Sequence, residues 1–362
     1  MAVTTKRMPW WAWAWPLLGW MILLATAMVS MNGVLTAVAG AALIATVFAA
    51  VYHAEVVAHR IGEPFGTLVL ALAVTVIEVA LIVSVMLGGK GDTAGLARDT
   101  VFAAVMIVCN GIVGLCLLTG GVRHFEQGFQ VEGANAALAV LAALTTLTLV
   151  LPNFTTSAAG PVFSTSQLVF AGVVSLVLYG AFVFVQTVRH RDYFLPVDDG
   201  GDEEDHAPPP SLKVALASTG LLLAALVAVV GLAKVLTPAV EAGVAQAGAP
   251  KTVVGIVIAA LVLLPEGVAA LRAARLNRLQ TSMNLALGSA LASIGLTIPA
   301  VAVVSIVLGQ PLALGLGFKE EILLALTLLV GVITLGTGRT TVLQGIVHLV
   351  IFAAFLFLAV VP

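Results

Sequence analysis

Glu78 and Glu266 are the residues of this sequence best suited to cation chemistry, because each lies deep within a long apolar segment. Placing a carboxylate at membrane depth costs about 2.5–3.5 kcal/mol on insertion scales, so chains that keep one there usually use it. A single buried glutamate is often a neutral, hydrogen-bonded structural residue, but two at corresponding places favour a functional pair. Two facing carboxylates would offer about two negative charges and four oxygens, which suits a hard divalent cation such as Ca²⁺.

Polar groups near the two glutamates could supply the remaining cation ligands. The hydroxyl and amide side chains placed for this role are Thr75, Asn110, Ser289 and Ser293. Pro265 directly precedes Glu266, and a proline in a membrane helix leaves backbone carbonyls free to face a cavity.

The same carboxylate pair predicts exchange of a cation for protons. Without a cation, two like charges in a low dielectric repel each other, and at least one should take up a proton. Protons and metal would then compete for the same oxygens. A carrier that reorients only when its site is neutralised would be an antiporter.

Two further titratable residues are weaker candidates: His348, in the last apolar segment, and Glu55. His348 could relay protons, although a histidine in such a segment more often hydrogen bonds to a neighbouring helix. Glu55 precedes the Glu78 segment on the expected cytoplasmic side, where it is either a relay or an interfacial charge.

The composition places these residues in a polytopic membrane protein. Of the 362 residues, 60% are hydrophobic and only 9% are charged, whereas soluble domains carry about 25% charged residues. The net charge of -2 argues against a nucleic-acid partner. Cys109 and Cys116 are seven residues apart in one apolar segment and are expected to be buried free thiols.

Eleven hydrophobic segments predict an all-α fold with eleven transmembrane helices. They span roughly 15–31, 33–52, 65–87, 100–119, 135–152, 165–188, 212–236, 252–271, 283–308, 321–337 and 341–361. A tryptophan cluster before the first segment suits an interfacial anchor. Lys6 and Arg7 precede that segment as in a signal peptide, but the tryptophans and the later segments favour an uncleaved first helix.

The basic residues predict the orientation of these helices. With the N-terminus in the cytoplasm, eleven fall inside: Lys6, Arg7, Arg60, Arg123, Arg189, Arg191, Lys213, Arg272, Arg275, Arg278 and Arg339. Five fall outside: Lys90, Arg98, Lys234, Lys251 and Lys319. This excess follows the positive-inside rule. The sequence therefore predicts a multi-pass protein of the cell inner membrane with its N-terminus in the cytoplasm and its C-terminus outside.

An acidic linker at 189–211 divides the chain near its midpoint. Its carboxylates are Asp198, Asp199, Asp202, Glu203, Glu204 and Asp205, and three prolines follow them. It is either a solvated hinge or a cytoplasmic patch that collects cations.

The linker also separates two five-segment halves, 33–188 and 212–361, which follow an additional N-terminal helix within 1–31. Glu78 lies in the second segment of the first half, and Glu266 in the second segment of the other. Because five is odd, two directly joined halves would have opposite orientations. The matched features predict an inverted repeat with its site near the membrane midplane.

These residues resemble the calcium/cation antiporter superfamily, specifically its cation/proton exchanger branch and the bacterial ChaA-type antiporters. The resemblance lies in AEVVAHRIGEPFGTLVLALAVTVIE and LPEGVAALRAARLNRLQTSMNLALGSALASIGLTIP, and the general plan extends over essentially the whole chain. It implies eleven helices, ion-binding glutamates at Glu78 and Glu266, and a cytosolic acidic segment at Asp198–Asp205. The family's usual Gly-Asn-Ala-x-Glu run is replaced here by Thr75-Val76-Ile77-Glu78 and Leu263-Leu264-Pro265-Glu266. ChaA-type members are associated with Na⁺ and K⁺ as well as Ca²⁺.

The leading hypothesis is a secondary antiporter that moves Ca²⁺ against protons without a cofactor. The first alternative is a monovalent Na⁺ or K⁺/proton antiporter on the same fold, because one carboxylate per cation would suffice. A Na⁺/Ca²⁺ exchanger ranks below these, because such sites hold more polar side chains. The sequence contains no HExxH, GxSxG, Walker lysine loop or CxxC motif, which disfavours a membrane enzyme. The buried acid pair disfavours a purely structural protein.

Overall fold

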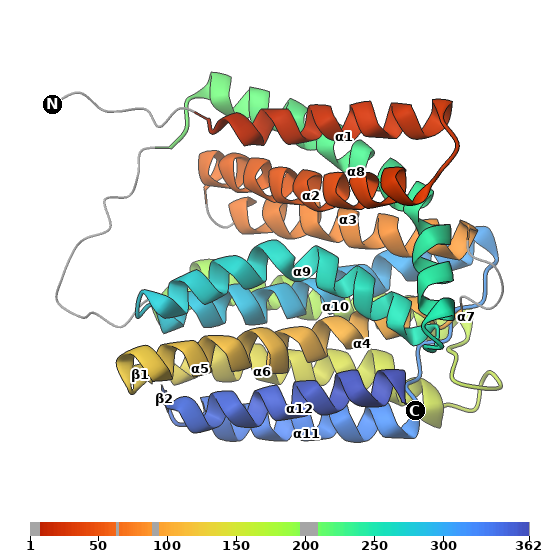
Figure 1. Cartoon of the computed structure of the whole chain (residues 1–362). Helices are drawn as coiled ribbons and strands as arrows, with labels where there is room; N and C mark the ends of the chain where they lie inside the picture. The colour runs from red at the N-terminus through yellow and green to blue at the C-terminus, as the bar shows by residue number, and fades with distance from the viewer. Residues whose placement is uncertain (1–7, 63–64, 89–93, 196–208, 362) are drawn as a thin grey trace, which may run out of the picture.

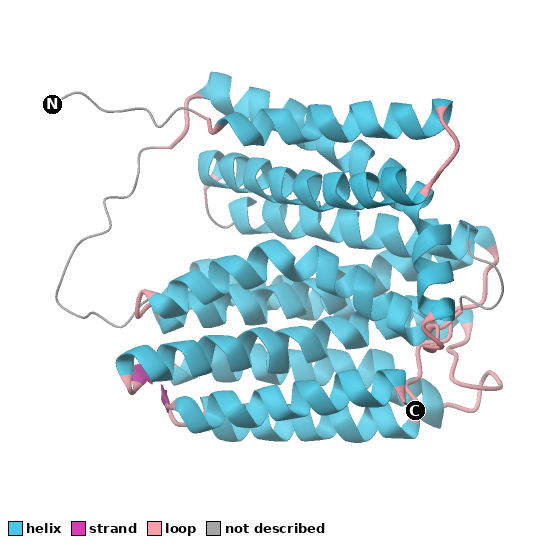
Figure 2. Ribbon diagram, viewed as in Figure 1, coloured by secondary structure: helices cyan, strands magenta, loops and turns pink. Residues whose placement is uncertain are grey.

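The protein is a bundle of long helices that run roughly parallel to one another (Figure 2). The structure, a computed structural model, describes residues 8–62, 65–88, 94–195 and 209–361. Within these ranges the helical rods are α1 (Trp10–Met28), α2 (Gly33–Ile61), α3 (Phe65–Gly88), α4–η1–α5 (Leu96–Met106, Ile107–Ile112, Val113–His124), α6–η2–η3 (Val131–Thr145, Thr146–Val150, Leu151–Phe154), α7–η4 (Thr165–Phe184, Val185–Arg189), α8 (Leu212–Gln246), α9 (Thr252–Arg275), α10 (Leu279–Leu308), α11 (Phe318–Leu335) and α12 (Val342–Val360). A short helix, η5 (Arg191–Phe194), follows η4, and two short strands, β1 (Gln127–Gly128) and β2 (Arg339–Thr340), pair antiparallel.

Each of the eleven predicted segments corresponds to one of these rods, which confirms the all-α membrane fold. Several rods run past the predicted ends: α2 continues to Ile61 and α8 to Gln246. The helices extend beyond their apolar stretches because polar residues continue a helix as readily as apolar ones. Among the described residues, ten rods are long and apolar enough to cross a membrane. The exception, α11, has Lys319, Glu320 and Glu321 in its first turn.

Helix ends alternate between the two ends of the bundle as predicted. In Figure 1, α1 and α8 both start at the left end, whereas α12 finishes at the right end. The last turns of α2, α5 and α9 carry arginines and lie at the left, whereas α4 and α11 start at the right. Several of the basic residues expected on one side of the membrane therefore lie at the same end of the bundle. The assignment of that end to the cytoplasm stays a prediction. The acidic residues Asp198–Asp205 lie outside the described residues.

Two groups of helices flank a central pair. One group contains α1, α2, α3 and α8, in which α2 packs against the other three (Figure 1). The other contains α4–α5, α6, α11 and α12. Between them lie α9 and α10, which pack against each other and against α3. Glu78 on α3 and Glu266 on α9 therefore point to the junction of these three helices as the candidate site.

The central helix α10 can occupy this position because it carries no charged residue. Most of its residues from Ser282 to Ser305 are buried, as expected of a helix without a charged face. Gly295 allows α7 to approach closely, because a Cβ atom there would lie 2.8 Å from the Cβ atom of Tyr179. Pro299 interrupts the hydrogen bonding of the same helix.

Candidate ion site at the junction of α3, α9 and α10

Glu78 is held in a fixed position in the protein interior. Its side chain is only 1% exposed, and its Oε2 atom accepts a hydrogen bond of 2.9 Å from the Thr297 hydroxyl on α10. Ser293, one turn earlier on α10, also interacts with this carboxylate. Residues four apart share one face of a helix, so α10 presents two hydroxyls to Glu78.

Glu266 has a more open environment. Its Oε2 atom is buried but has no hydrogen-bond partner among the described residues. The carboxylate interacts electrostatically with Glu55 on α2 and Glu78 on α3. Glu78 and Glu266 are thus near enough to act on each other electrostatically, as does Glu55 on Glu266 from α2.

The junction contains several oxygen atoms without partners. In the described part of the chain, Thr75 Oγ1, Glu78 Oε1 and Glu266 Oε2 are buried and accept or donate no hydrogen bond. Such atoms normally have partners, and leaving one unpaired costs about 1–3 kcal/mol. A cation or protons bound between these oxygens would remove that cost.

Two backbone carbonyls of α9 and α10 also lose their usual helical donor. A proline has no N–H group, so the carbonyl four residues before it loses its usual helical donor. Pro265 frees the carbonyl of Leu261 in this way, and Pro299 frees that of Gly295, between Ser293 and Thr297. Within the described ranges, no three His, Cys, Asp or Glu side chains form a metal-binding group. The chemistry of the junction is therefore a carboxylate pair supplemented by neutral oxygens.

The other candidate residues lie at different distances from this junction. Ser289 is one turn before Ser293 on α10 and is partly exposed, and Glu55 has an exposed side chain. Thr297 was not among the site residues predicted from the sequence. Its spacing of four from Ser293 was the signal that could have identified it.

Asn110 and His348 belong to a separate polar cluster. His348 Nδ1 and Asn110 Oδ1 are 3.1 Å apart, and Asn110 Nδ2 donates to Thr327 Oγ1 at 2.9 Å. His348 Nε2 lies 3.1 Å from Thr334 Oγ1. The structure thus ties His348 to neighbouring helices, the more common of the two roles considered for it. The free thiols Cys109 and Cys116 are buried nearby, as expected.

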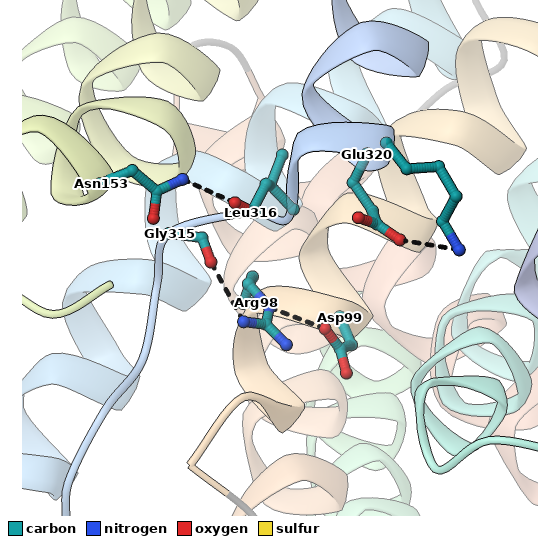
Figure 3. Close-up of polar contacts among 7 residues, drawn as sticks. Arg98, Asp99, Asn153, Gly315, Leu316 and Glu320 are labelled. Atoms are coloured by element: carbon teal, nitrogen blue, oxygen red, sulfur yellow. Dashed lines mark hydrogen bonds and ion pairs between the residues drawn. The ribbon is translucent and has the colours of Figure 1, made fainter. Parts of the chain in front are cut away.

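A pocket of about 180 Å³ lies at the right-hand end of the bundle, between α4, α9, α11 and α12. Figure 3 shows part of its charged rim: Arg98 donates to Asp99 at 2.8 Å and to the Gly315 carbonyl at 3.0 Å. Lys319 pairs with Glu320 at 3.3 Å. These charges already neutralise one another, so this pocket differs from the junction with its unpaired oxygens.

Comparisons with known proteins agree with this geometry. A 53% identical protein of Sinorhizobium fredii, y4hA, is described as an ionic transporter; the match covers 100% of this chain and 99% of that protein. The sodium-potassium/proton antiporter ChaA of Escherichia coli is 37% identical over 87% of this chain and 85% of its own length. The structure of YfkE, described as a Ca²⁺/H⁺ antiporter, has the same fold, with a TM-score of 0.73 at 18% identity over 97% of this chain and 99% of YfkE.

Carboxylates and hydroxyls that meet between long membrane helices are typical of membrane proteins that carry ions, and this is the class to which the fold and the site point. The chain belongs to the sodium/calcium exchanger protein family, whose profile matches residues 31–188 and 217–361. The two matched stretches lie on either side of the acidic linker.

Proposed function

We propose that this protein is a secondary antiporter that exchanges Ca²⁺ for protons, with Glu78 and Glu266 binding cation and protons alternately. The observation that carries the proposal is the set of buried, unpaired oxygens Thr75 Oγ1, Glu78 Oε1 and Glu266 Oε2. Ca²⁺ takes six to eight oxygen ligands at 2.3–2.6 Å. The two carboxylates, the hydroxyl of Thr75 and the freed carbonyls of Leu261 and Gly295 provide ligands of this kind.

Exchange follows from the competition between cation and protons. Two carboxylates without a cation in a low dielectric repel each other, and protons relieve that repulsion. Glu55 adds a third negative charge that acts on Glu266. Either a cation or protons must therefore neutralise the junction before the carrier can reorient.

A monovalent cation is the second candidate substrate. The 37% identical relative from Escherichia coli is named for sodium and potassium, and Na⁺ or K⁺ would need only one of the two carboxylates. The same fold and the same oxygens would then perform Na⁺/H⁺ or K⁺/H⁺ exchange. The two proposals differ in the charge of the transported cation and in the number of protons that it displaces from the carboxylates in each cycle.

The remaining assignments follow from this function. The protein acts as a transporter rather than an enzyme, in the inner membrane, with the N-terminus and the acidic linker in the cytoplasm. Its two repeats are 33–188 and 212–361, preceded by the N-terminal helix. No organic cofactor takes part, because the transported ions are the substrates.

The test uses purified protein in liposomes with a preset pH gradient. We expect external Ca²⁺ to collapse the gradient, and we expect Glu78→Gln and Glu266→Gln to abolish that response. Na⁺ and K⁺ are added in separate experiments. Collapse by Na⁺ or K⁺ but not by Ca²⁺ would replace the calcium proposal with the monovalent one. No response to any of the three cations would overturn both.

A further inference from the structure

A short π-helix, η1 (Ile107–Ile112), interrupts the rod α4–α5 in the middle of the membrane-spanning region. All six of its residues are buried, and it packs against α9, α10, α11 and α12. A π turn of this kind is uncommon and is often found at functional sites. It lies next to α9 and α10, two of the three helices that form the ion site.

A continuous chain of hydrogen bonds fixes η1 to α11 and α12. Since Asn110 Oδ1 can only accept, His348 Nδ1 must carry the proton in their 3.1 Å contact. The neutral ring can then accept from the Thr334 hydroxyl through Nε2. Asn110 donates onward to Thr327, whose hydroxyl donates to the Leu323 carbonyl at 2.7 Å.

In this chain each ring nitrogen of a neutral His348 has a hydrogen-bond partner. The chain ends at a backbone carbonyl, and in the described part of the structure no hydrogen bond connects it to Glu78 or Glu266. A proton relay would need such a connection, either direct or through water molecules. We call the chain of Asn110, His348, Thr327 and Thr334 the α11–α12 brace.

The other side of η1 touches the helix turn that carries Glu266. Gly267, the residue after Glu266, faces the side chain of Ile112 at the end of η1. A Cβ atom at position 267 would lie 3.2 Å from Ile112 Cδ1 and 3.4 Å from Ile112 Cγ1. A contact of that length would be tighter than ordinary packing, so a side chain at position 267, next to Glu266, would press on Ile112 where α9 packs against η1.

We infer that the brace is a positioning device: through η1 and Ile112 it sets the place of Glu266, and Asn110 and His348 lie outside the ion and proton path. This inference rests on the proposed function. It assigns to Asn110 and His348 a role that differs from ligand or relay. Its consequence is that changes in the brace should alter cation affinity without altering the proton chemistry.

The first test is a compensating pair at the Ile112–Gly267 contact. Gly267→Ala should overpack the contact, displace Glu266 and raise the KM for the transported cation about fivefold or more. Ile112→Val removes the Cδ1 atom that the new methyl group would meet. The double variant Ile112→Val/Gly267→Ala should return KM to within about twofold of wild type, which is the coupling expected of residues in contact.

The second test separates a brace from a relay at His348. His348→Gln keeps a hydrogen-bond donor and an acceptor but has no titratable group, whereas His348→Leu removes both the donor and the acceptor. We expect near-wild-type exchange from the glutamine variant. We expect a raised KM from the leucine variant, by the same factor at every pH. Thr334→Val, which removes a single bond of the brace, provides a milder variant should the leucine variant fail to fold.

Two outcomes would overturn the inference. One is a KM in the double variant that stays as high as in Gly267→Ala. The other is a pH profile of exchange that changes shape equally in His348→Gln and His348→Leu, because that would make His348 a proton carrier. Wild-type activity with Ca²⁺, Na⁺ or K⁺ in the same liposomes shows whether the proposed function holds. A failure of the proposed antiport function is therefore distinguishable from a failure of the inference about the brace.

Discussion

Glu78 and Glu266 occupy corresponding places in the two halves of the chain, yet their surroundings differ. Glu78 lies on an uninterrupted helix, is almost fully buried, and is held by hydroxyls of α10. Glu266 follows a proline and is partly exposed, and while each glutamate has one buried oxygen without a partner among the described residues, it is the other oxygen of Glu78 that accepts from Thr297. Glu78 is therefore the anchored carboxylate and Glu266 the unanchored one.

This difference suggests a division of labour within the site. An anchored carboxylate keeps its geometry whether or not a cation is present, so it can define the position of the ion. An unanchored carboxylate can change its orientation as protons and cations exchange. Glu55 also acts electrostatically on Glu266. The following experiments test this view, beginning with the largest expected effect.

Neutralising either glutamate should remove exchange. Glu78→Gln and Glu266→Gln preserve size and hydrogen bonding but remove a charge that the cation requires, so cation-driven collapse of a pH gradient should be absent in both. Glu126→Gln is the matched control, since Glu126 is exposed and pairs with Arg339 at a loop. Near-wild-type exchange in both site variants, with normal membrane insertion, would exclude an essential role for the charges.

The pH dependence should report how many protons each cation displaces. Lowering the pH fills the carboxylates with protons and raises the apparent KM for the cation; raising the pH lowers it. If Ca²⁺ displaces protons from both glutamates, log KM should fall by up to about two per pH unit, and by about one for a monovalent ion. Initial rates across a pH series measure this slope. A KM that does not vary with pH would contradict competition at a shared site.

Removing the anchor should weaken cation binding while leaving exchange measurable. Thr297→Val has a similar shape but no hydroxyl, so Glu78 Oε2 would lose its hydrogen bond. A bond to a charged group contributes about 1.5–3 kcal/mol, so KM should rise by about tenfold or more. Thr297→Ser keeps the hydroxyl and is the control. If valine and serine behaved alike, the hydroxyl would not anchor Glu78.

Neutralising the acidic linker should have the smallest effect. Changing Asp198, Asp199, Asp202, Glu203, Glu204 and Asp205 together to amides lowers the local cation concentration, and salt screens this contribution. The apparent cytoplasmic KM for Ca²⁺ should rise mainly at low ionic strength, with little change in the maximal rate. Complete loss of exchange at saturating Ca²⁺ in a folded protein would place the linker in the transport path.

The fold and the identity of the two central carboxylates could be predicted from the sequence. Hydrophobic segments of membrane length must form helices, because the bilayer leaves backbone groups no other partner. The cost of a buried charge singles out Glu78 and Glu266 with no knowledge of their neighbours. Both arguments concern a residue and its solvent, so they need only local sequence.

Which polar groups meet was decided by the tertiary structure. Thr297 donates to Glu78 across 219 positions of sequence, whereas Asn110 donates to Thr327, 217 positions later. Both are polar residues in apolar segments, and the sequence distinguishes them poorly. Their contacts depend on how each helix is rotated and which helix packs beside it. That rotation results from packing over the whole length of neighbouring helices, including Gly295 against Tyr179 and Gly267 against Ile112.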